Sequence, residues 1–163
     1  MIVVRRCSSD ELVAVETSWP IPGDVHRAHY AAQRSGTATY LIGWVDAEPL
    51  GSGMIQWKGC SGPNARRAYP DAVEINHLQV RPECRGRGVG TAIIQDAEIR
   101  AAGRRRTLVA LGVEVGNERA VRLYRRLGYE PTGVLDTFAY SWIDSDGISH
   151  SENETSELLV KHL

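Results

Sequence analysis

The sequence has few cysteines, and none of them is placed as one of a pair. Its 163 residues include three, which are odd in number, widely spaced and free of any Cys-x-x-Cys arrangement. Because disulfide frameworks and zinc-binding thiols both need matched pairs, neither is expected. We therefore predict reduced thiols in a cytoplasmic protein that has no metal site. The three residues are Cys7, Cys60 and Cys84.

The sequence also lacks a long hydrophobic run. No stretch approaches the roughly 20 consecutive apolar residues that a membrane-spanning helix requires. The first residues, MIVVRRCSSDE, place arginines after the apolar run and acids after the arginines, which is the wrong order for a secretory signal. Repeats and low-complexity segments are absent as well. Since 42% of the residues are hydrophobic, we expect one soluble domain over residues 1–163 with a proper core and no membrane partner.

The chain has little net charge, but its charges are unevenly distributed. The formal net charge is -1. Residues 81–126 contain eleven arginines against five acids, whereas residues 127–160 contain seven acids and no basic residue other than His150. Most such charges are solvated surface. The asymmetry nevertheless indicates that one region can hold an anion while another attracts a cation.

The pattern of apolar residues and helix boundaries predicts an α/β fold. Ser8, with Glu11 three residues later, forms a capping box that begins a helix, and Asp24 and Asn117 are expected to cap two more. A turn near the sequence DSDG joins the last two strands. The order of elements is that of a sandwich of helices around one mixed sheet. Helices are expected after Ser8 and over residues 25–35, 89–103 and 117–127; strands over 2–4, 37–45, 49–57, 73–80, 107–115, 134–144 and 156–163; and a loop over 58–72.

The stretch RPECRGRGVG, residues 81–90, concentrates arginine and glycine between a predicted strand and a predicted helix. The first amides of a helix lack intrahelical partners and the helix dipole is positive there, so such a turn favours an anion. A P-loop would need a Gly-Lys pair, which the chain lacks. A dinucleotide-binding fingerprint would need a glycine where Thr91 stands and an acid where arginines 104–106 stand. Two interpretations remain open, a site for a phosphate-bearing ligand and a tight turn with exposed arginines.

Two motifs, in order, resemble those of the GCN5-related N-acetyltransferases, the GNAT superfamily. The pattern Arg-x-x-Gly-x-Gly that begins at Arg85, after a strand ending LQVRP, is similar to the acetyl-CoA signature of that superfamily. The segment NERAVRLYRRLGY is similar to its second motif, with Asn117 and Tyr124 in register. Together the motifs and their connection cover residues 73–129. The resemblance implies an α/β/α sandwich with a mixed, mostly antiparallel sheet of about six to seven strands and about four helices.

The same resemblance implies how acetyl-CoA would bind. Six consecutive backbone amides would cradle the CoA pyrophosphate. Two arginines have a position at this turn that favours contact with phosphate over a role as solvent-exposed charge. The backbone at the end of the preceding strand would pair with pantetheine as an added strand does. Asn117 would lie beside the pantetheine arm and Tyr124 near the thioester sulfur. The expected cofactor-binding residues are Leu78, Gln79, Val80, Arg85, Gly86, Arg87, Gly88, Val89, Gly90, Thr91, Asn117 and Tyr124.

Acetylation of an amine needs a base for the ammonium proton, donors for the oxyanion and an acid for the thiolate. The resemblance implies that Tyr124 is the acid and that the backbone N–H of Leu78 is the oxyanion donor. Glu74 matches the glutamate base of the histone-acetylating branch. His77 and ordered water are rival bases, although His77 lies on the other face of the strand unless a bulge intervenes. Gly112 stands where the branch that acetylates ribosomal-protein N-termini has a glutamate, which weakens assignment to that branch.

The expected acceptor is a cationic primary amine of a small molecule or a peptide, which attacks acetyl-CoA directly in a ternary complex. The acidic C-terminal stretch suits such a cation, and a homodimer is left open. A catalytically silent acyl-CoA sensor or scaffold is one alternative class. A nucleic-acid-binding module is another, disfavoured because only Tyr124 and Tyr129 interleave with the arginines and because the acidic half opposes it. We therefore expect no nucleic-acid partner.

Overall fold

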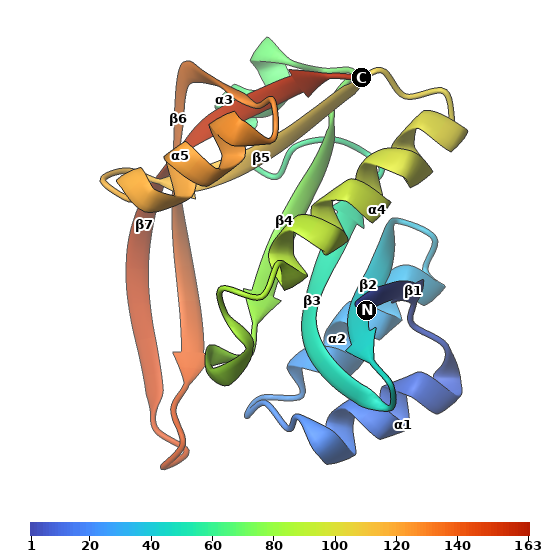
Figure 1. Ribbon diagram of the computed structural model, residues 1–163. Coiled ribbons are helices and arrows are strands. Elements are labelled where there is room, and N and C mark those ends of the chain that lie inside the picture. The colour runs from blue at the N-terminus through green and yellow to red at the C-terminus, as the bar shows by residue number, and fades with distance from the viewer. The chain divides into compact units, whose positions relative to one another are not determined.

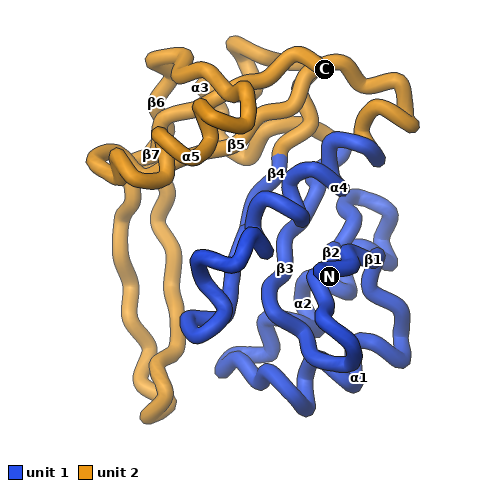
Figure 2. Tube along the Cα trace, in the orientation of Figure 1, with its two compact units in different colours: residues 1–57, 75–100 blue, residues 58–74, 101–163 orange.

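The computed structural model describes residues 1–163, which form seven strands and five α-helices (Figure 1). The chain divides into two compact units, residues 1–57 with 75–100 and residues 58–74 with 101–163 (Figure 2). None of the helices has the length and hydropathy that crossing a membrane requires. In chain order the elements are β1 (Val3–Arg6), α1 (Ser9–Ser18), α2 (Val25–Arg34), β2 (Ala38–Val45), β3 (Glu48–Gln56), α3 (Pro63–Ala68), β4 (Val73–Val80), the 3₁₀ turn η1 (Pro82–Cys84), α4 (Val89–Gly103), β5 (Leu108–Glu114), α5 (Glu118–Arg126), β6 (Glu130–Ile143) and β7 (Ser149–His162).

The sheet of unit 1 is covered by helices on both faces. Its strands follow the order β1-β2-β3-β4, with β1–β2 and β2–β3 antiparallel. Tyr40 and Ile42 of β2 pack in one cluster with Leu12 of α1, whereas a Cβ added to Gly43 would meet side chains of α4. Since successive side chains of a strand point to opposite faces, α1 and α4 lie on opposite sides of β2. This arrangement confirms the predicted sandwich of helices and sheet and buries every residue of β2 except the last.

Two glycines of β3 bring α4 close to the sheet of unit 1. A Cβ added to Gly51 would lie 2.8 Å from both the carbonyl oxygen of Gln79 and Cγ1 of Val89. A Cβ added to Gly53 would lie 2.9 Å from Cγ2 of Ile93. Because such distances are too short for real contacts, any side chain here would push α4 and β4 away from β3. The glycines therefore set the position of the first turn of α4.

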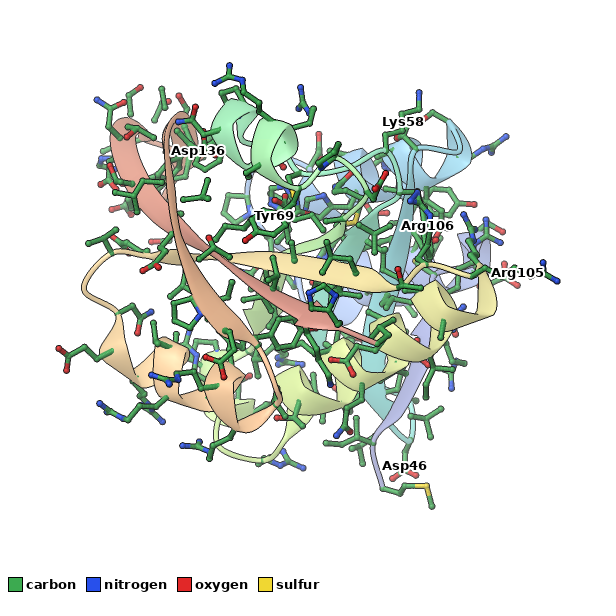
Figure 3. All side chains as sticks on the ribbon, turned by 90° about the horizontal axis from the view of Figure 1, so that it is seen from above. Asp46, Lys58, Tyr69, Arg105, Arg106 and Asp136 are labelled. Carbon is green, nitrogen blue, oxygen red and sulfur yellow. The ribbon has the colours of Figure 1, made fainter.

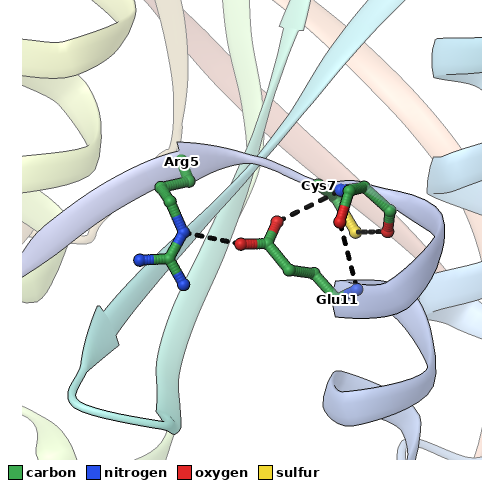
Figure 4. Close-up of polar contacts among 4 residues, drawn as sticks. Arg5, Cys7 and Glu11 are labelled. Carbon is green, nitrogen blue, oxygen red and sulfur yellow. Dashed lines mark hydrogen bonds and ion pairs between the residues drawn. The ribbon is translucent and has the colours of Figure 1, made fainter.

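The first two helices begin differently. The predicted capping box is present at α1, where Ser8 Oγ accepts the N–H of Glu11 at 3.2 Å and Glu11 accepts the N–H of Ser8 at 3.1 Å (Figure 4). Glu11 also accepts from Arg5 Nε at 2.6 Å, which ties β1 to α1. The prediction that Asp24 caps α2 through its side chain is wrong, because its φ of 55° is left-handed and no such bond forms. A capping side chain reaches the first amides of a helix from an extended backbone.

In unit 2 the strands follow the order β5-β7-β6, and both pairs are antiparallel. The strands β6 and β7 have 14 residues each and form a long hairpin (Figure 1). The predicted turn near the sequence DSDG is confirmed, but the predicted strands, 134–144 and 156–163, are too short. The missing part of β7, residues 149–155, reads SHSENET, and its residues are exposed or only half-buried. A strand with so little burial lacks the alternation of apolar and polar residues that sequence analysis detects.

The segment predicted as a loop, residues 58–72, contains the short helix α3. Its N-cap residue, Gly62, has no side chain to offer. The buried carboxylate of Asp136 in β6 takes that role, accepting the N–H of Asn64 at 3.0 Å and that of Ala65 at 2.9 Å (Figure 3). A cap that lies about 70 residues away along the chain leaves no local pattern, which is why the helix was not predicted.

The three cysteines are all buried and unpaired. Burial raises the pKa of the Cys7 thiol and of the Cys60 thiol to about 12. A thiol with such a pKa stays protonated at neutral pH and is a poor nucleophile. Both side chains therefore act as small apolar groups of their cores.

Candidate functional site

The Arg/Gly loop, residues 81–88, leaves β4 from a fixed base. The N–H of Arg81 donates to the carbonyl oxygen of Leu50 at 2.9 Å. Its guanidinium donates to the carbonyl oxygen of Pro49 at 3.1 Å and to the carboxylate of Glu83 at 2.9 Å. Arg81 is thus engaged within the protein. It anchors the loop to the start of β3 and does not extend toward a ligand.

The three glycines at positions 86, 88 and 90 differ in whether the backbone conformation requires glycine. Gly86 and Gly88 have φ of +76° and +83°, which strains any residue with a side chain. Gly90 has no such conformation, and a Cβ there would meet only the side chains of Leu78 and Val80, at 3.8 Å. The turn itself therefore requires glycine at positions 86 and 88. At position 90 the fold itself does not require glycine, because a Cβ would make only ordinary van der Waals contacts with those two side chains.

The Arg/Gly loop leads directly into the N-terminus of α4. The N–H of Ala92 donates to the carbonyl oxygen of Gly88 at 3.0 Å, so the amides of residues 89–91 precede the hydrogen bonds of the helix. Arg85 and Arg87 are exposed, and neither forms an ion pair within the protein. Unpaired amides, the positive end of the helix dipole and two available guanidiniums together favour phosphate groups.

The strand β4 is continuous over Val73–Val80 but is irregular at His77, whose φ of +49° is left-handed. A non-glycine residue with positive φ inside a strand indicates a bulge-like irregularity. Beyond it, Leu78 and Val80 are half-buried and face the start of α4. The simple alternation that was expected to separate Glu74 from His77 is therefore broken between them.

His77 belongs to a cluster of rings in unit 1. Its ring centroid lies 4.8 Å from that of His29, which in turn lies 5.2 Å from that of Tyr40. His26 places Nδ1 2.6 Å from the Tyr40 hydroxyl and Nε2 2.7 Å from the carbonyl oxygen of Trp19. Because a carbonyl only accepts, Nε2 carries the proton and the hydroxyl donates to Nδ1 of a neutral ring. Burial lowers the pKa of all three histidines, that of His29 to about 4. His77 keeps part of its surface open to solvent, yet it accepts protons less readily than a fully hydrated histidine.

Glu74 is buried in unit 2 and is held by Ser61. Its Oε1 accepts from Ser61 Oγ at 2.6 Å, and the N–H of Ser61 lies 3.3 Å from both carboxylate oxygens. Ser61 comes just before α3, so the carboxylate is oriented toward the segment of residues 58–72. Sequence reasoning found Glu74 but missed Ser61, because a serine within a loop carries no pattern of its own.

The second motif forms α5 and its ends. Asn117 Oδ1 accepts the N–H of Ala120 at 3.1 Å, which confirms the predicted N-cap. Tyr124 is half-buried, with its ring edge-to-face with that of Tyr129 at 6.5 Å. Burial raises the pKa of Tyr124, and its hydroxyl donates to no group of the protein. A phenol that stays protonated and is free to donate meets the requirement for a general acid.

The predicted site residues thus form two groups, one in each unit. Unit 1 contains residues 78–80 and 85–91, and the side chains at 78 and 80 lie within van der Waals reach of a Cβ at position 90. Unit 2 contains Glu74, Asn117 and Tyr124, of which the last two share α5 and its cap. The contacts of these residues with acetyl-CoA stay a prediction.

Comparison with known proteins decides the family. The model of the acetyltransferase (GNAT) family matches residues 6–129, well over half of the chain. The chain belongs to the GNAT family. The matched region contains both motifs, the Arg/Gly loop and α5.

Individual relatives differ in how much of them this chain covers. An uncharacterized N-acetyltransferase of Methanocaldococcus jannaschii is 43% identical over 65 residues, which are 40% of this chain and 29% of that protein. The N-alpha-acetyltransferase RimI of Mycobacterium tuberculosis is 28% identical over 138 residues, 80% of this chain and 74% of that protein. This chain is therefore similar to less than a third of the first relative and to most of the second.

The fold is similar to that of solved GNAT structures. A GNAT superfamily phosphinothricin acetyltransferase of Sinorhizobium meliloti, solved in complex with acetyl-CoA, superposes with a TM-score of 0.67 at 17% identity, over 99% of this chain and 88% of that one. This GNAT protein of seven strands and five helices therefore has the predicted fold class.

Proposed function

We propose that this GNAT protein transfers the acetyl group of acetyl-CoA to a primary amine. The observation that carries the proposal is the Arg/Gly loop with the first turn of α4. Two left-handed glycines, the unpaired amides of residues 89–91 and the exposed side chains of Arg85 and Arg87 suit the CoA pyrophosphate. Family membership and the acetyl-CoA bound to the S. meliloti relative support the same cofactor.

The residues of the chain take the following roles in this proposal. Acetyl-CoA supplies an activated carbonyl, which the amine attacks directly, forming a C–N bond as the C–S bond breaks. The N–H of Leu78 donates to the oxygen as negative charge develops on it. Glu74 takes the first proton, which the ammonium loses before it attacks, and Tyr124 gives its proton to the departing thiolate. The nitrogen releases a second proton as the amide forms, and that proton restores the phenol. The raised pKa of Tyr124 keeps that proton in place at neutral pH.

The acceptor is proposed to be a cationic amine, with a peptide amine as the first class and a small molecule as the second. The relative from M. tuberculosis is named as an N-alpha-acetyltransferase, which favours a peptide N-terminus. Gly112 departs from the glutamate of that branch, so the base must come from elsewhere. Glu74 is the buried carboxylate that the chain offers on β4.

An acceptor panel tests the proposed function. Peptides with free N-termini, a peptide with one free lysine, polyamines and aminoglycosides are incubated with acetyl-CoA, and free thiol is followed. We expect release of thiol that depends on both the enzyme and the acceptor, with the acetylated amine found by mass spectrometry. Tight acetyl-CoA binding without acceptor-dependent thiol release for any amine would contradict the transferase and favour a silent sensor.

Glu74→Gln, compared with Ser61→Ala, tests the base. If Glu74 is the base, the glutamine variant loses the rise of kcat/KM with pH, and its activity falls by about 100-fold. Ser61→Ala removes a hydrogen bond but leaves the carboxylate, so its pH profile is expected to keep its shape. Equal effects of the two variants with unchanged profiles would show that Glu74 only holds residues 58–72 in place.

A further inference from the structure

The hairpin of β6 and β7 presents two chemically different faces. Side chains of directly paired residues in antiparallel strands share a face, so the register separates two sets. One face carries mostly small polar side chains and Ile143 near the turn, and on it Thr137 and Thr155 hydrogen-bond at 2.8 Å. The other carries aromatic rings of β6 opposite acids and a histidine of β7. Its pairs are Phe138 with Glu154, Tyr140 with Glu152 and Trp142 with His150. We name these six residues the aromatic–acidic face.

Two rings of this face, Tyr140 and Trp142, contact side chains of β7 and are nevertheless exposed. The Tyr140 hydroxyl donates to Glu152 at 2.9 Å, and the Trp142 ring stacks on His150 with centroids 4.4 Å apart. His150 is held in turn by Asp144 at 2.8 Å. Even so, 40% of Tyr140 and 43% of Trp142 remain accessible to solvent. Large aromatic side chains that are exposed to solvent on one face of a two-stranded hairpin are typical of an interaction surface.

The two carboxylates of this face form no ion pair within the chain. Neither Glu152 nor Glu154 forms an ion pair, and residues 127–160 contain no arginine or lysine. The pKa of Tyr140 is raised, chiefly by its hydrogen bond to Glu152 and further by the charge of Glu154. The surroundings of the rings are therefore negative, and the charge that complements them is positive.

We propose that the aromatic–acidic face binds an extended basic segment of a peptide or protein acceptor. A lysine or arginine is attracted both to a carboxylate and to the face of an aromatic ring, and this face offers both side by side. Side chains on one face of a strand repeat about every 7 Å, as alternate residues of an extended peptide do. The face therefore matches a segment that has a basic residue at every second position.

The hairpin would therefore favour acceptors that contain, in addition to the amine that is acetylated, an extended segment with a basic residue at every second position. That the bound segment belongs to an acceptor rests on the proposed function. The binding itself does not, because all six residues lie on β6 and β7 and the contacts need no acetyl-CoA. Binding and transfer can therefore be measured separately.

Fluorescence anisotropy of labelled peptides, without acetyl-CoA, tests the binding. One peptide carries lysine at every second position between serines, and its isomer carries the same lysines in one block. We expect the alternating peptide to bind at least about threefold more tightly, and the affinity to fall as salt is raised because the contacts are exposed charges. Equal affinity of the two peptides, or no binding at low salt, would overturn the inference.

Matched variants locate the binding on one face. Trp142→Ala is paired with Ile143→Ala, since Ile143 is 41% exposed on the opposite face. Glu152→Gln is paired with Asp146→Asn, which removes one acid from the turn instead. We expect the first variant of each pair to weaken binding by about fivefold or more, and the second by less than about twofold. Equal losses within both pairs would contradict the assignment of the face.

Two further outcomes separate this inference from the proposed function. Transfer to small amines with no binding of the alternating peptide would overturn the inference and leave the transferase intact. Peptide binding on this face without acetylation of any amine would support the surface and contradict the transferase. A dimer in sedimentation that Trp142→Ala dissociates would also overturn the inference, because a second copy of the chain would then cover the face.

Discussion

A Gly88→Val protein is expected to bind acetyl-CoA about 100-fold more weakly or worse, as measured by calorimetric titration. Gly88 has a φ of +83°, a conformation that a β-branched residue avoids. Relief of the strain rotates the peptide groups that lead into α4, so their amides no longer point at a bound phosphate. Hydrogen bonds to charged groups contribute about 1.5–3 kcal/mol each, and losing two of them accounts for a loss of this size.

Gly36→Val is the matched control for this substitution. Gly36 has a φ of +84°, and no heavy atom lies within 4 Å of an added Cβ, as at Gly88. The backbone strain of the two variants is therefore the same, but Gly36 follows α2 and lies outside the Arg/Gly loop. We expect it to lower the melting temperature slightly and to keep the affinity for acetyl-CoA. Equal losses of affinity in both variants would show that strain alone causes the effect.

The second large effect is expected from Tyr124→Phe, which should lower kcat by about 100-fold while KM for acetyl-CoA changes by less than about twofold. General acid catalysis contributes about 10²- to 10⁴-fold, and the substitution removes only the proton donor. The phenyl ring keeps its edge-to-face contact with Tyr129, and no hydrogen bond of the protein is lost. Steady-state kinetics with acetyl-CoA and a saturating acceptor measure the effect.

The pH dependence provides an independent check on Tyr124. Burial raises its pKa from a reference value of about 10. The phenol therefore stays protonated through neutral and mildly alkaline solution, and loss of its proton lowers kcat only above about pH 10. We expect this alkaline decline in the unsubstituted protein and not in Tyr124→Phe. Equal losses of kcat and of acetyl-CoA affinity in the variant would contradict a role as the acid.

The features of the site that could be predicted from the sequence are formed by residues that lie close together along the chain. Gly86 and Gly88 could be placed because a strand, a glycine turn and a helix follow one another within a few residues. The cap made by Asn117 and the capping box at Ser8 are equally local, since the bonded groups are three residues apart. Local hydrogen bonds and turn conformations leave patterns that can be read directly.

The parts that remained hidden depend on contacts between distant residues. Asp136, which lies in β6, caps the helix α3, and Ser61 binds the carboxylate of Glu74 by a hydrogen bond. The contact of His29 with His77 joins α2 to β4. The exposed end of the hairpin has no buried face, so burial leaves no trace in its sequence. Each of these features requires the folded chain before it can be recognised.

A calorimetric titration of the unsubstituted protein with acetyl-CoA tests the central claim most directly. We predict one site per chain with a dissociation constant in the micromolar range, and an increase in melting temperature with ligand concentration as mass action requires. No heat and no thermal stabilisation at millimolar acetyl-CoA would contradict the account, because the Arg/Gly loop would then not be a CoA site.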